Sequence, residues 1–399
     1  MGTAFEEAIN KAVDEKVIAG AAVVAVDKSG ILGTTKYAKA FGTTSLGKGG
    51  KPFQIDSTMW LASCTKISTA VSCMQCVERG LLSLDDPIGK ILPEWTTPEI
   101  LTGFDENEKP ILKKATKTLT LRHLLTHSSG MGYPAFNPLL QRYLKAMGKP
   151  VGFPQGAIKD DLMLPLLFEP GEGWEYGGSI DWAGQMVERV NGGIRLGQYM
   201  KKHIFEPLGM KYTTFRPSEH PGVQERFIGR PFRTPDGKVI PDAPDVGMYP
   251  VREADDDYGG AGLYSCAEDY IKIVASLLVD DGKLLKSESI DELFRPQLPD
   301  TNYIQAVMDV PEAAQFLAPS FGTGVKWNYA LGGAVAVDGV EERADKGMMY
   351  WAGLPNSYWW IDRRRGICGV YATQFFPPGD HPTQKLFTQF QKDVYAMAG

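Results

Sequence analysis

A serine and a lysine stand three residues apart at Ser63 and Lys66, and together they could supply a nucleophile with a base beside it. The apolar residues that follow them recur at helical spacing, and Gly80 ends the run as a C-terminal glycine of a helix does. On a helix, residues i and i+3 share a face, so the Lys66 amine can lie beside the Ser63 hydroxyl. Ser45 and Lys48 have the same spacing, but they lie in a glycine-rich stretch that cannot hold two side chains in register. The pair alone leaves two interpretations open: a catalytic nucleophile with its base, or an N-terminal helical turn with a solvated lysine.

The sequence does not indicate a histidine base for this serine. The pentapeptide Gly-x-Ser-x-Gly of the α/β-hydrolases is absent. Of the five histidines, His123 and His127 have the i, i+4 spacing of a zinc pair, but no Glu follows the first and the segment is apolar. We therefore interpret both as structural, and we expect no metal site and no cofactor.

Tyr176 is the best candidate for a base. It precedes Gly177 and Gly178, so it sits on a glycine-rich turn at the entrance of a helix, where a phenol can be presented to a cleft. A free phenol is a poor base, but a nearby ammonium such as Lys66 would stabilise its ionised form. Which of the two holds the proton at rest is open at this point. A tyrosine packed within a loop is the alternative interpretation.

A third motif lies near the end of the chain, where residues 351–356 follow an expected strand. Gly353 would allow close approach of a substrate to the backbone, and a neighbouring N–H could point at a developing oxyanion. Together with the N–H of Ser63, such a group would complete a two-donor oxyanion hole.

The elements around these motifs predict two lobes, because 399 residues exceed what one hydrophobic core usually organises. A helix and two strands at the start, and four strands and a helix at the end, predict one antiparallel sheet completed by both ends of the chain. The expected strands cover residues 21–26, 31–41, 329–337, 346–351, 357–361 and 367–376. We expect a discontinuous α/β lobe over 1–85 and 321–399, an inserted helical lobe over 86–320, and a site in the cleft between them.

Composition narrows the class of protein further. Hydrophobic content of 43% and charged content of 23% are typical of a soluble globular protein. The net charge of -6 argues against nucleic acid or an anionic membrane as partner. No apolar run could span a bilayer, and the first twenty residues lack the layout of a secretory signal. Five cysteines without a disulfide pattern indicate reduced thiols, so we expect a cytoplasmic protein. The oligomeric state is open.

The motifs occur in an order that resembles the serine β-lactamase and penicillin-binding-protein superfamily. Connecting segments resemble its class C branch, namely residues 61–66, 80–86, 121–130, 207–210 and 259–265. Within that branch the sequence is similar to family VIII carboxylesterases and to fungal acyltransferases of statin-type polyketides. Residues 78–80, 103–105 and 181–184 resemble the fungal group in particular.

This resemblance implies a β-lactamase-like α/β (α+β) fold, with an antiparallel sheet flanked by N- and C-terminal helices and an inserted, mostly helical lobe. It further implies that Ser63 is the acylated nucleophile and that Lys66 and Tyr176 are its activating pair. The backbone N–H groups of Ser63 and Leu354 would form the oxyanion hole.

Two departures from the family pattern bear on the substrate. The family's Tyr-x-Asn motif is replaced by Tyr176-Gly177-Gly178, which has no amide side chain at its third position. The Lys-Thr-Gly motif of β-lactamases is replaced by Trp351-Ala352-Gly353. An indole offers apolar surface where a lysine would meet the carboxylate of a β-lactam. We therefore expect esters or thioesters with aliphatic or aromatic acyl groups. Side chains that either line this pocket or pack in the core are those of Tyr133, Phe136, Trp174 and Trp351.

These features favour a serine carboxylesterase or acyltransferase that works through a Ser63 acyl-enzyme on a small-molecule ester or thioester. Water or an alcohol acceptor would resolve the intermediate, and the sequence does not distinguish hydrolysis from transesterification. A β-lactamase or D-aminopeptidase-type amide hydrolase is the first alternative. A non-catalytic binding protein with the same fold is the second. Retention of all three catalytic side chains argues against the latter.

Overall fold

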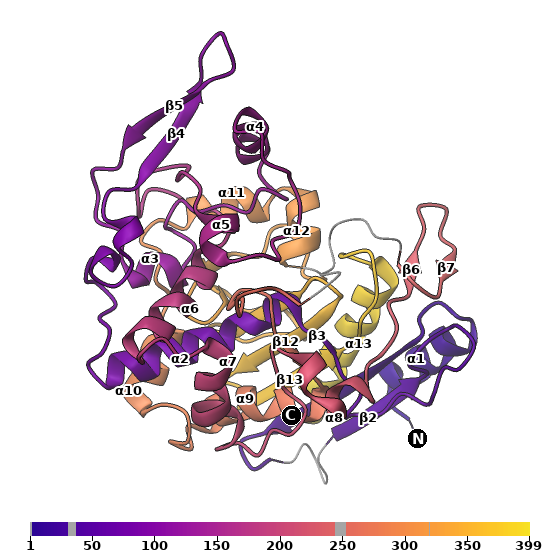
Figure 1. Ribbon diagram of the computed structural model, residues 1–399. Coiled ribbons are helices and arrows are strands. Elements are labelled where there is room, and N and C mark those ends of the chain that lie inside the picture. The colour runs from indigo at the N-terminus through magenta and orange to yellow at the C-terminus, as the bar shows by residue number, and fades with distance from the viewer. Residues whose placement is uncertain (1, 31–36, 244–252, 319) are drawn as a thin grey trace.

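A seven-stranded antiparallel sheet, in the order β2-β1-β13-β12-β11-β10-β9, forms the centre of the fold (Figure 1). The computed structural model describes residues 2–30, 37–243, 253–318 and 320–399. The sheet strands are β1 (Gly20–Asp27), β2 (Tyr37–Gly42), β9 (Trp327–Tyr329), β10 (Ala334–Ala336), β11 (Met349–Gly353), β12 (Ser357–Asp362) and β13 (Ile367–Ala372). β1 pairs with β13 from Ala22 opposite Ala372 to Asp27 opposite Ile367, so both ends of the chain complete one sheet. The predicted α/β (α+β) fold is thereby confirmed.

One predicted strand is wrong, and another lies partly outside the described residues. The single strand predicted over 329–337 is wrong: β9 and β10 are separated by a turn in which the Ala330 N–H bonds to the Gly333 carbonyl. Gly332 lies in that turn, where a Cβ would meet Ile67 Cδ1 at 2.6 Å, so a larger residue there would require the Ile67 side chain to move. In the strand predicted over 31–41, residues 31–36 lie outside the described residues, and β2 begins at Tyr37.

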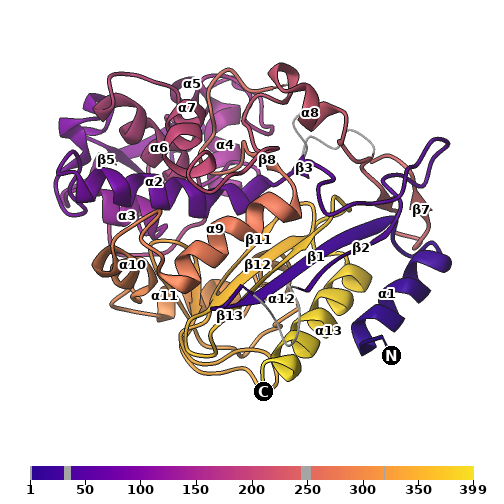
Figure 2. The same cartoon turned by 90° about the horizontal axis from the view of Figure 1, so that it is seen from below.

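The two terminal helices cover one face of the sheet, α1 (Ala4–Asp14) beside α13 (His381–Met397) (Figure 2). Aromatic side chains fill this layer, with Phe5 and Phe390 ring centroids 5.2 Å apart and Tyr358 and Phe387 centroids 4.4 Å apart. Such rings bury large apolar areas, which stabilises the packing of both helices on the sheet.

The opposite face of the sheet carries α9 (Ala267–Val279), which contacts β1, β12 and β13. The Tyr270 hydroxyl of α9 donates to the Cys64 carbonyl at 2.6 Å, so this helix also supports the turn that holds Ser63. α9 falls within the range expected for the helical lobe, yet it packs on the sheet. The division into lobes with the bounds given above stays a prediction.

The remaining elements lie beyond the α9 face and around it. α2 (Lys66–Glu78) is almost entirely buried and packs against α6 (Ser179–Val190), which also contacts α3 (Leu121–Leu125). The hairpin of β4 (Glu99–Phe104) and β5 (Pro110–Lys114) projects from the body of the molecule (Figure 1). The other helices are α4 (Pro138–Ala146), α5 (Ile158–Leu162), α7 (Leu196–Met200), α8 (Pro221–Gln224), α10 (Ser287–Phe294), α11 (Asn302–Met308) and α12 (Pro311–Leu317). The short strands are β3 (Met59–Trp60), β6 (Phe232–Arg233), β7 (Val239–Ile240) and β8 (Tyr264–Ser265). None of the helices formed by the described residues has the length and apolar character needed to cross a membrane.

Candidate active site

Ser63 lies on a short 3-10 helix, Ala62–Thr65, that connects β3 to α2. Ala62 has a φ of 46°, a left-handed conformation that costs free energy for a residue with a Cβ and persists only where neighbours enforce it. Thr65 provides such support, because its hydroxyl donates to the Ala62 carbonyl at 2.7 Å and accepts from the Leu263 N–H at 3.1 Å. Side chains at i and i+3 eclipse in a 3-10 helix, so this turn aligns Lys66 with Ser63 more closely than the expected α-helix would.

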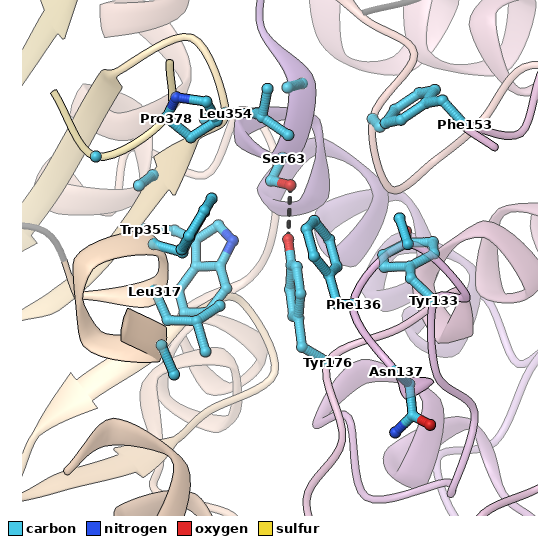
Figure 3. A pocket seen from close by; sticks show the side chains of 18 of the residues that line it. Ser63, Tyr133, Phe136, Asn137, Phe153, Tyr176, Leu317, Trp351, Leu354 and Pro378 are labelled. Atoms are coloured by element: carbon cyan, nitrogen blue, oxygen red, sulfur yellow. Dashed lines mark hydrogen bonds between the residues drawn. The ribbon is translucent and has the colours of Figure 1, made fainter. Parts of the chain in front are cut away.

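The three side chains predicted to form the catalytic group meet in the structure, and Figure 3 shows two of them, Ser63 and Tyr176. The Tyr176 hydroxyl donates to Ser63 Oγ at 2.6 Å. Lys66 Nζ donates to Ser63 Oγ at 3.2 Å and to the Gly260 carbonyl at 2.7 Å. Because only 3% of Lys66 is exposed, water competes little for its ammonium. The serine oxygen thus lies within hydrogen-bonding distance of both expected bases.

The Tyr176 ring is held by aromatic neighbours on several sides. Its centroid lies 5.4 Å from that of Trp351 and 4.8 Å from that of His127. Lys66 Nζ lies 4.7 Å from the ring centroid, at cation–π distance. On the backbone side, a Cβ at Gly177 would meet the Met131 carbonyl oxygen at 2.1 Å. The glycine run after Tyr176 is therefore needed for this segment to pack against its neighbours.

The two histidines with zinc-like spacing have separate surroundings. His123 takes part in a capping box with Thr120 at the start of α3. His127 is fully buried, and its Nδ1 accepts from the Gly177 N–H at 3.5 Å. Burial, with a further contribution from the Lys66 charge, lowers the pKa of His127 well below its ordinary value, so the imidazole is neutral. Among the residues that the structure describes, no group of His, Cys, Asp and Glu side chains could hold a metal ion.

Asp181, on the first turn of α6, is a site residue that the sequence did not single out. It is fully buried; its Oδ2 accepts from the Tyr133 hydroxyl at 2.7 Å and its Oδ1 accepts from the Gly260 N–H at 2.7 Å. The carbonyl of the same Gly260 residue accepts from Lys66. Burial raises the pKa of Asp181, and the Lys66 charge opposes that rise. An acidic residue in the first turn of a helix is common, so nothing local in the sequence marked Asp181 as a site residue.

The link from Asp181 to Lys66 has two further consequences. A Cβ on Gly260 would meet the Tyr133 hydroxyl at 2.6 Å and Asp181 Oδ2 at 2.7 Å, so a glycine is needed there. Burial and the Asp181 carboxylate raise the pKa of Tyr133 well above its ordinary value, which keeps this second phenol neutral. Tyr133 is therefore engaged with Asp181, whereas the Tyr176 hydroxyl faces Ser63.

Replacing Asp181 with alanine should leave the Gly260 N–H and the Tyr133 hydroxyl buried without this acceptor. We expect a loss of about 3 kcal/mol in the free energy of unfolding and, because Lys66 shifts with the Gly260 peptide, a fall of about 100-fold in kcat/KM. Asp181→Asn keeps an acceptor for Gly260 and should recover most of the stability. Chemical denaturation and steady-state kinetics measure the two effects.

Asp362 offers a matched control for this pair of variants. It is fully buried and accepts from the Tyr395 hydroxyl at 2.6 Å, but it lies outside the pocket. Asp362→Ala should lower stability by a similar amount while the folded protein keeps its kcat/KM. Equal losses of activity in Asp181→Ala and Asp362→Ala would show that Asp181 acts through stability alone.

The end of β11 packs directly against the turn that holds Ser63. A Cβ on Gly353 would meet the Leu61 carbonyl oxygen at 2.4 Å and Cys64 Sγ at 3.2 Å. The sequence predicted that this glycine lets a substrate approach the backbone; in the structure it also lets the strand approach the nucleophile turn. Leu354 follows it, and the side chains of Leu354 and Ser63 lie side by side at the pocket wall (Figure 3).

Gly353→Ala should therefore separate β11 from the nucleophile turn. We expect kcat to fall about 100-fold, since this separation would move apart the N–H groups of Ser63 and Leu354, the two donors predicted for the oxyanion hole. KM should change much less, because the aromatic walls stay in place. Ala352→Gly, at the neighbouring position, is the control and should keep most of the activity. A Gly353→Ala variant with unchanged kcat would contradict this role.

The pocket in front of Ser63 has a volume of about 500 Å³. Every residue predicted for the site lines this pocket except Lys66, which is buried beside Ser63. The lining residues among them are Ser63, Tyr133, Phe136, Trp174, Tyr176, Trp351, Gly353 and Leu354. Their roles in binding and catalysis stay predictions. The sequence missed the wall formed by α11 and α12 and the loop residue Phe153; the α11 and α12 residues concerned are Val307, Glu312, Ala313, Phe316 and Leu317. Their separation from the motifs along the chain left no local signal.

Comparison with known proteins finds relatives that are similar over nearly the whole chain. The family model described as Beta-lactamase matches residues 5–391. The chain is 35% identical over 405 residues to lovastatin esterase of Penicillium rubens, covering 99% of this chain and 98% of that protein. It is 33% identical over 401 residues to monacolin J acid methylbutanoyltransferase of Aspergillus terreus, covering 98% of this chain and 95% of that protein. A solved structure of simvastatin synthase from Aspergillus terreus, the LovD6 mutant, superposes with a TM-score of 0.90 at 33% identity, covering 99% of this chain and 96% of that one.

Proposed function

The chain belongs to the beta-lactamase family, and we propose that it is a serine carboxylesterase or acyltransferase for small-molecule esters and thioesters with hydrophobic acyl groups. The observation that carries this proposal is the contact of Ser63 Oγ with both Tyr176 and Lys66 at the wall of an aromatic pocket. The similarity to an esterase and to an acyltransferase over nearly the whole chain supports the reaction class.

In the first step, Ser63 Oγ attacks the carbonyl carbon of the ester. Its proton passes to the pair formed by Tyr176 and Lys66, both within hydrogen-bonding distance of the serine oxygen. Because both side chains contact the same serine oxygen, we propose that they act together in this proton transfer. The bond between the carbonyl carbon and the leaving oxygen or sulfur then breaks, and the pair returns the proton to the leaving alcohol or thiol.

The negative charge that develops on the carbonyl oxygen is stabilised by hydrogen-bond donors that point at this oxygen. We assign this role to the backbone N–H groups of Ser63 and Leu354, supported by their neighbouring positions at the pocket wall. One such donor contributes about 3 to 4 kcal/mol to transition-state stabilisation. The close packing of Gly353 on Leu61 keeps the two peptides together.

The second step resolves the Ser63 acyl-enzyme with water or with an alcohol. The Tyr176 and Lys66 pair takes the proton of the incoming oxygen and returns it to Ser63 as the acyl group leaves. The pocket of about 500 Å³ has room for an acyl group and an acceptor together. Water gives hydrolysis and an alcohol gives transesterification, and we propose that both occur on the same acyl-enzyme.

A single acyl donor tests the proposal and separates the two outcomes. The enzyme is incubated with p-nitrophenyl butyrate and increasing concentrations of small aliphatic alcohols. We expect release of p-nitrophenol. Because butyrate and the alkyl butyrate would form from one shared intermediate, the ratio of alkyl butyrate to butyrate should rise linearly with alcohol concentration. Release no faster than in buffer would contradict the proposal. Turnover of a cephalosporin or of a D-amino acid amide in place of the ester would favour the amide hydrolase alternative.

Two further proposals concern the organisation and location of the chain. We propose that residues 1–85 with 321–399 and residues 86–320 form the two lobes, supported by lining residues that come from both ranges. We also propose a cytoplasmic location, supported by five cysteines that are buried and free.

A further inference from the structure

The charged side chains that line the pocket are of one sign. Glu175 and Glu312 are among the lining residues, and the lining contributed by the described part of the chain includes no Lys, Arg or His. Lys66 lies behind Ser63, where its ammonium donates to the Gly260 carbonyl and has Asp181 as a nearby counter-charge. Apart from Lys66 at the Ser63 hydroxyl, the charged side chains that a substrate meets in this pocket are therefore the carboxylates of Glu175 and Glu312.

Glu175 has a defined place in the wall. It directly precedes Tyr176, it is half-buried, and its Oε1 accepts from Asn137 Nδ2 at 3.0 Å. The backbone N–H of Glu175 donates to the His127 carbonyl at 2.9 Å, which fixes the start of the tyrosine turn. Glu312, on α12, also lines the pocket and is exposed. Of the two carboxylates, Glu175 has less water around it and should interact more strongly with a bound charge.

Aromatic rings make up much of the remaining wall. Phe136 and Phe316 contact each other in this wall with ring centroids 6.3 Å apart, and Phe153, Tyr258 and Trp351 also line the pocket. The faces of such rings carry negative electrostatic potential, and sets of rings bind quaternary ammonium groups in other proteins. Rings and carboxylates together favour a bulky cation, and both oppose an anion.

We infer that this pocket prefers esters that carry an alkylammonium group over uncharged esters of the same shape, and that it disfavours esters that carry a free carboxylate. Glu175 is the residue assigned to this discrimination, with a smaller contribution from Glu312. The inference rests on the proposed function, because it concerns which esters reach Ser63. It separates this chain from the relative named for monacolin J acid, whose named substrate is a carboxylic acid.

Three butyrate esters of nearly identical shape test the inference. Butyrylcholine carries the cation, 3,3-dimethylbutyl butyrate is its uncharged isostere, and the butyrate ester of 4-hydroxy-2,2-dimethylbutanoate replaces one methyl group with a carboxylate. At low ionic strength we expect kcat/KM for the cation to exceed that for the neutral ester by about tenfold, and the anion to fall below the neutral ester by about tenfold. Sodium chloride at high concentration should reduce both ratios.

Variants assign the effect to its residue. Glu175→Gln keeps an oxygen acceptor for Asn137 and removes the charge, and should reduce the cation-to-neutral ratio to about twofold. Glu312→Gln should reduce it less. Glu342→Gln is the control, because Glu342 is an exposed carboxylate paired with Lys392 outside this pocket, and should leave the ratio unchanged. Because each comparison is a ratio within one variant, a loss of folded protein does not affect it.

Equal kcat/KM for the three esters, or a cation preference that Glu175→Gln leaves intact, would overturn the inference. Turnover of the neutral ester in that experiment would leave the proposed function standing. Failure of all three esters to react, together with no p-nitrophenol from p-nitrophenyl butyrate, would instead overturn the proposed function and the inference with it.

Discussion

Ser63→Ala is expected to lower kcat for p-nitrophenyl butyrate by about 10⁴- to 10⁶-fold, the range seen when a catalytic serine is removed. The side chain forms no part of the hydrophobic core and occupies the pocket wall, so the fold and its unfolding transition should be unchanged. The loss would follow from the absence of an oxygen that can carry the acyl group. Release of p-nitrophenol by purified wild-type and variant proteins measures the difference.

Ser45 provides a matched control, because it heads the other Ser-x-x-Lys sequence of the chain. In the structure its Oγ accepts from the Gly47 N–H at 3.0 Å within a turn of its own. Ser45→Ala should keep wild-type activity. Activity retained in Ser63→Ala, or an equal loss in Ser45→Ala, would exclude Ser63 as the nucleophile.

Removing the proposed base pair should have the second largest effect. Tyr176→Phe deletes the hydroxyl that contacts Ser63 Oγ at 2.6 Å and keeps the ring between Trp351 and His127. We expect kcat to fall about 10³-fold for Tyr176→Phe and by a similar factor for Lys66→Met. This loss lies within the range that general base catalysis contributes to a rate. The measurement is single-turnover acylation, which reports the step in which serine loses its proton.

The double variant distinguishes joint action of Tyr176 and Lys66 from independent action. If Tyr176 and Lys66 act as one unit, Tyr176→Phe combined with Lys66→Met should be little slower than either single variant. Independent roles would instead multiply the two losses. Tyr329→Phe is the control, since Tyr329 packs 5.3 Å from the Trp351 ring without being part of the proposed base pair, and it should acylate at the wild-type rate.

The three members of the proposed catalytic group could be singled out because each has a local signal, although each signal alone left a structural interpretation open. Ser63 and Lys66 share a spacing on one turn, and Tyr176 is flanked by glycines that a packed helix entrance would not otherwise need. The meeting of Tyr176 with Ser63 could not be derived from spacing, because 113 residues separate them. The resemblance to a known superfamily supplied that pairing, and the 2.6 Å contact agrees with it.

Asp181 and the α11–α12 wall show what the sequence could not provide. The role of Asp181 depends on the Gly260 peptide, 79 residues away, which links its carboxylate to Lys66. Phe316 lines the pocket only because α12 packs near the end of β11. A turn closed by the Ala330 N–H and the Gly333 carbonyl separates β9 from β10, and the strand pattern did not reveal it. Long-range packing decides the places of Asp181 and Phe316.

The sheet, by contrast, was accessible from pattern alone. Short β-rich runs occur at both ends of the chain, and an antiparallel sheet is the arrangement that buries them together. The register of β1 on β13 confirms this. The position of α9 on the sheet was not predicted, because an amphipathic helix reveals which face it buries and not against which partner.

The proposed reaction requires a covalent bond between the substrate acyl group and Ser63. Rapid acid quench of the enzyme with p-nitrophenyl butyrate, followed by intact mass measurement and peptide mapping, tests it most directly. We predict one butyryl group on the peptide that contains Ser63, with a much smaller amount in Tyr176→Phe at the same quench time. A butyryl group on any other residue, or an equal adduct in Ser63→Ala, would contradict the account.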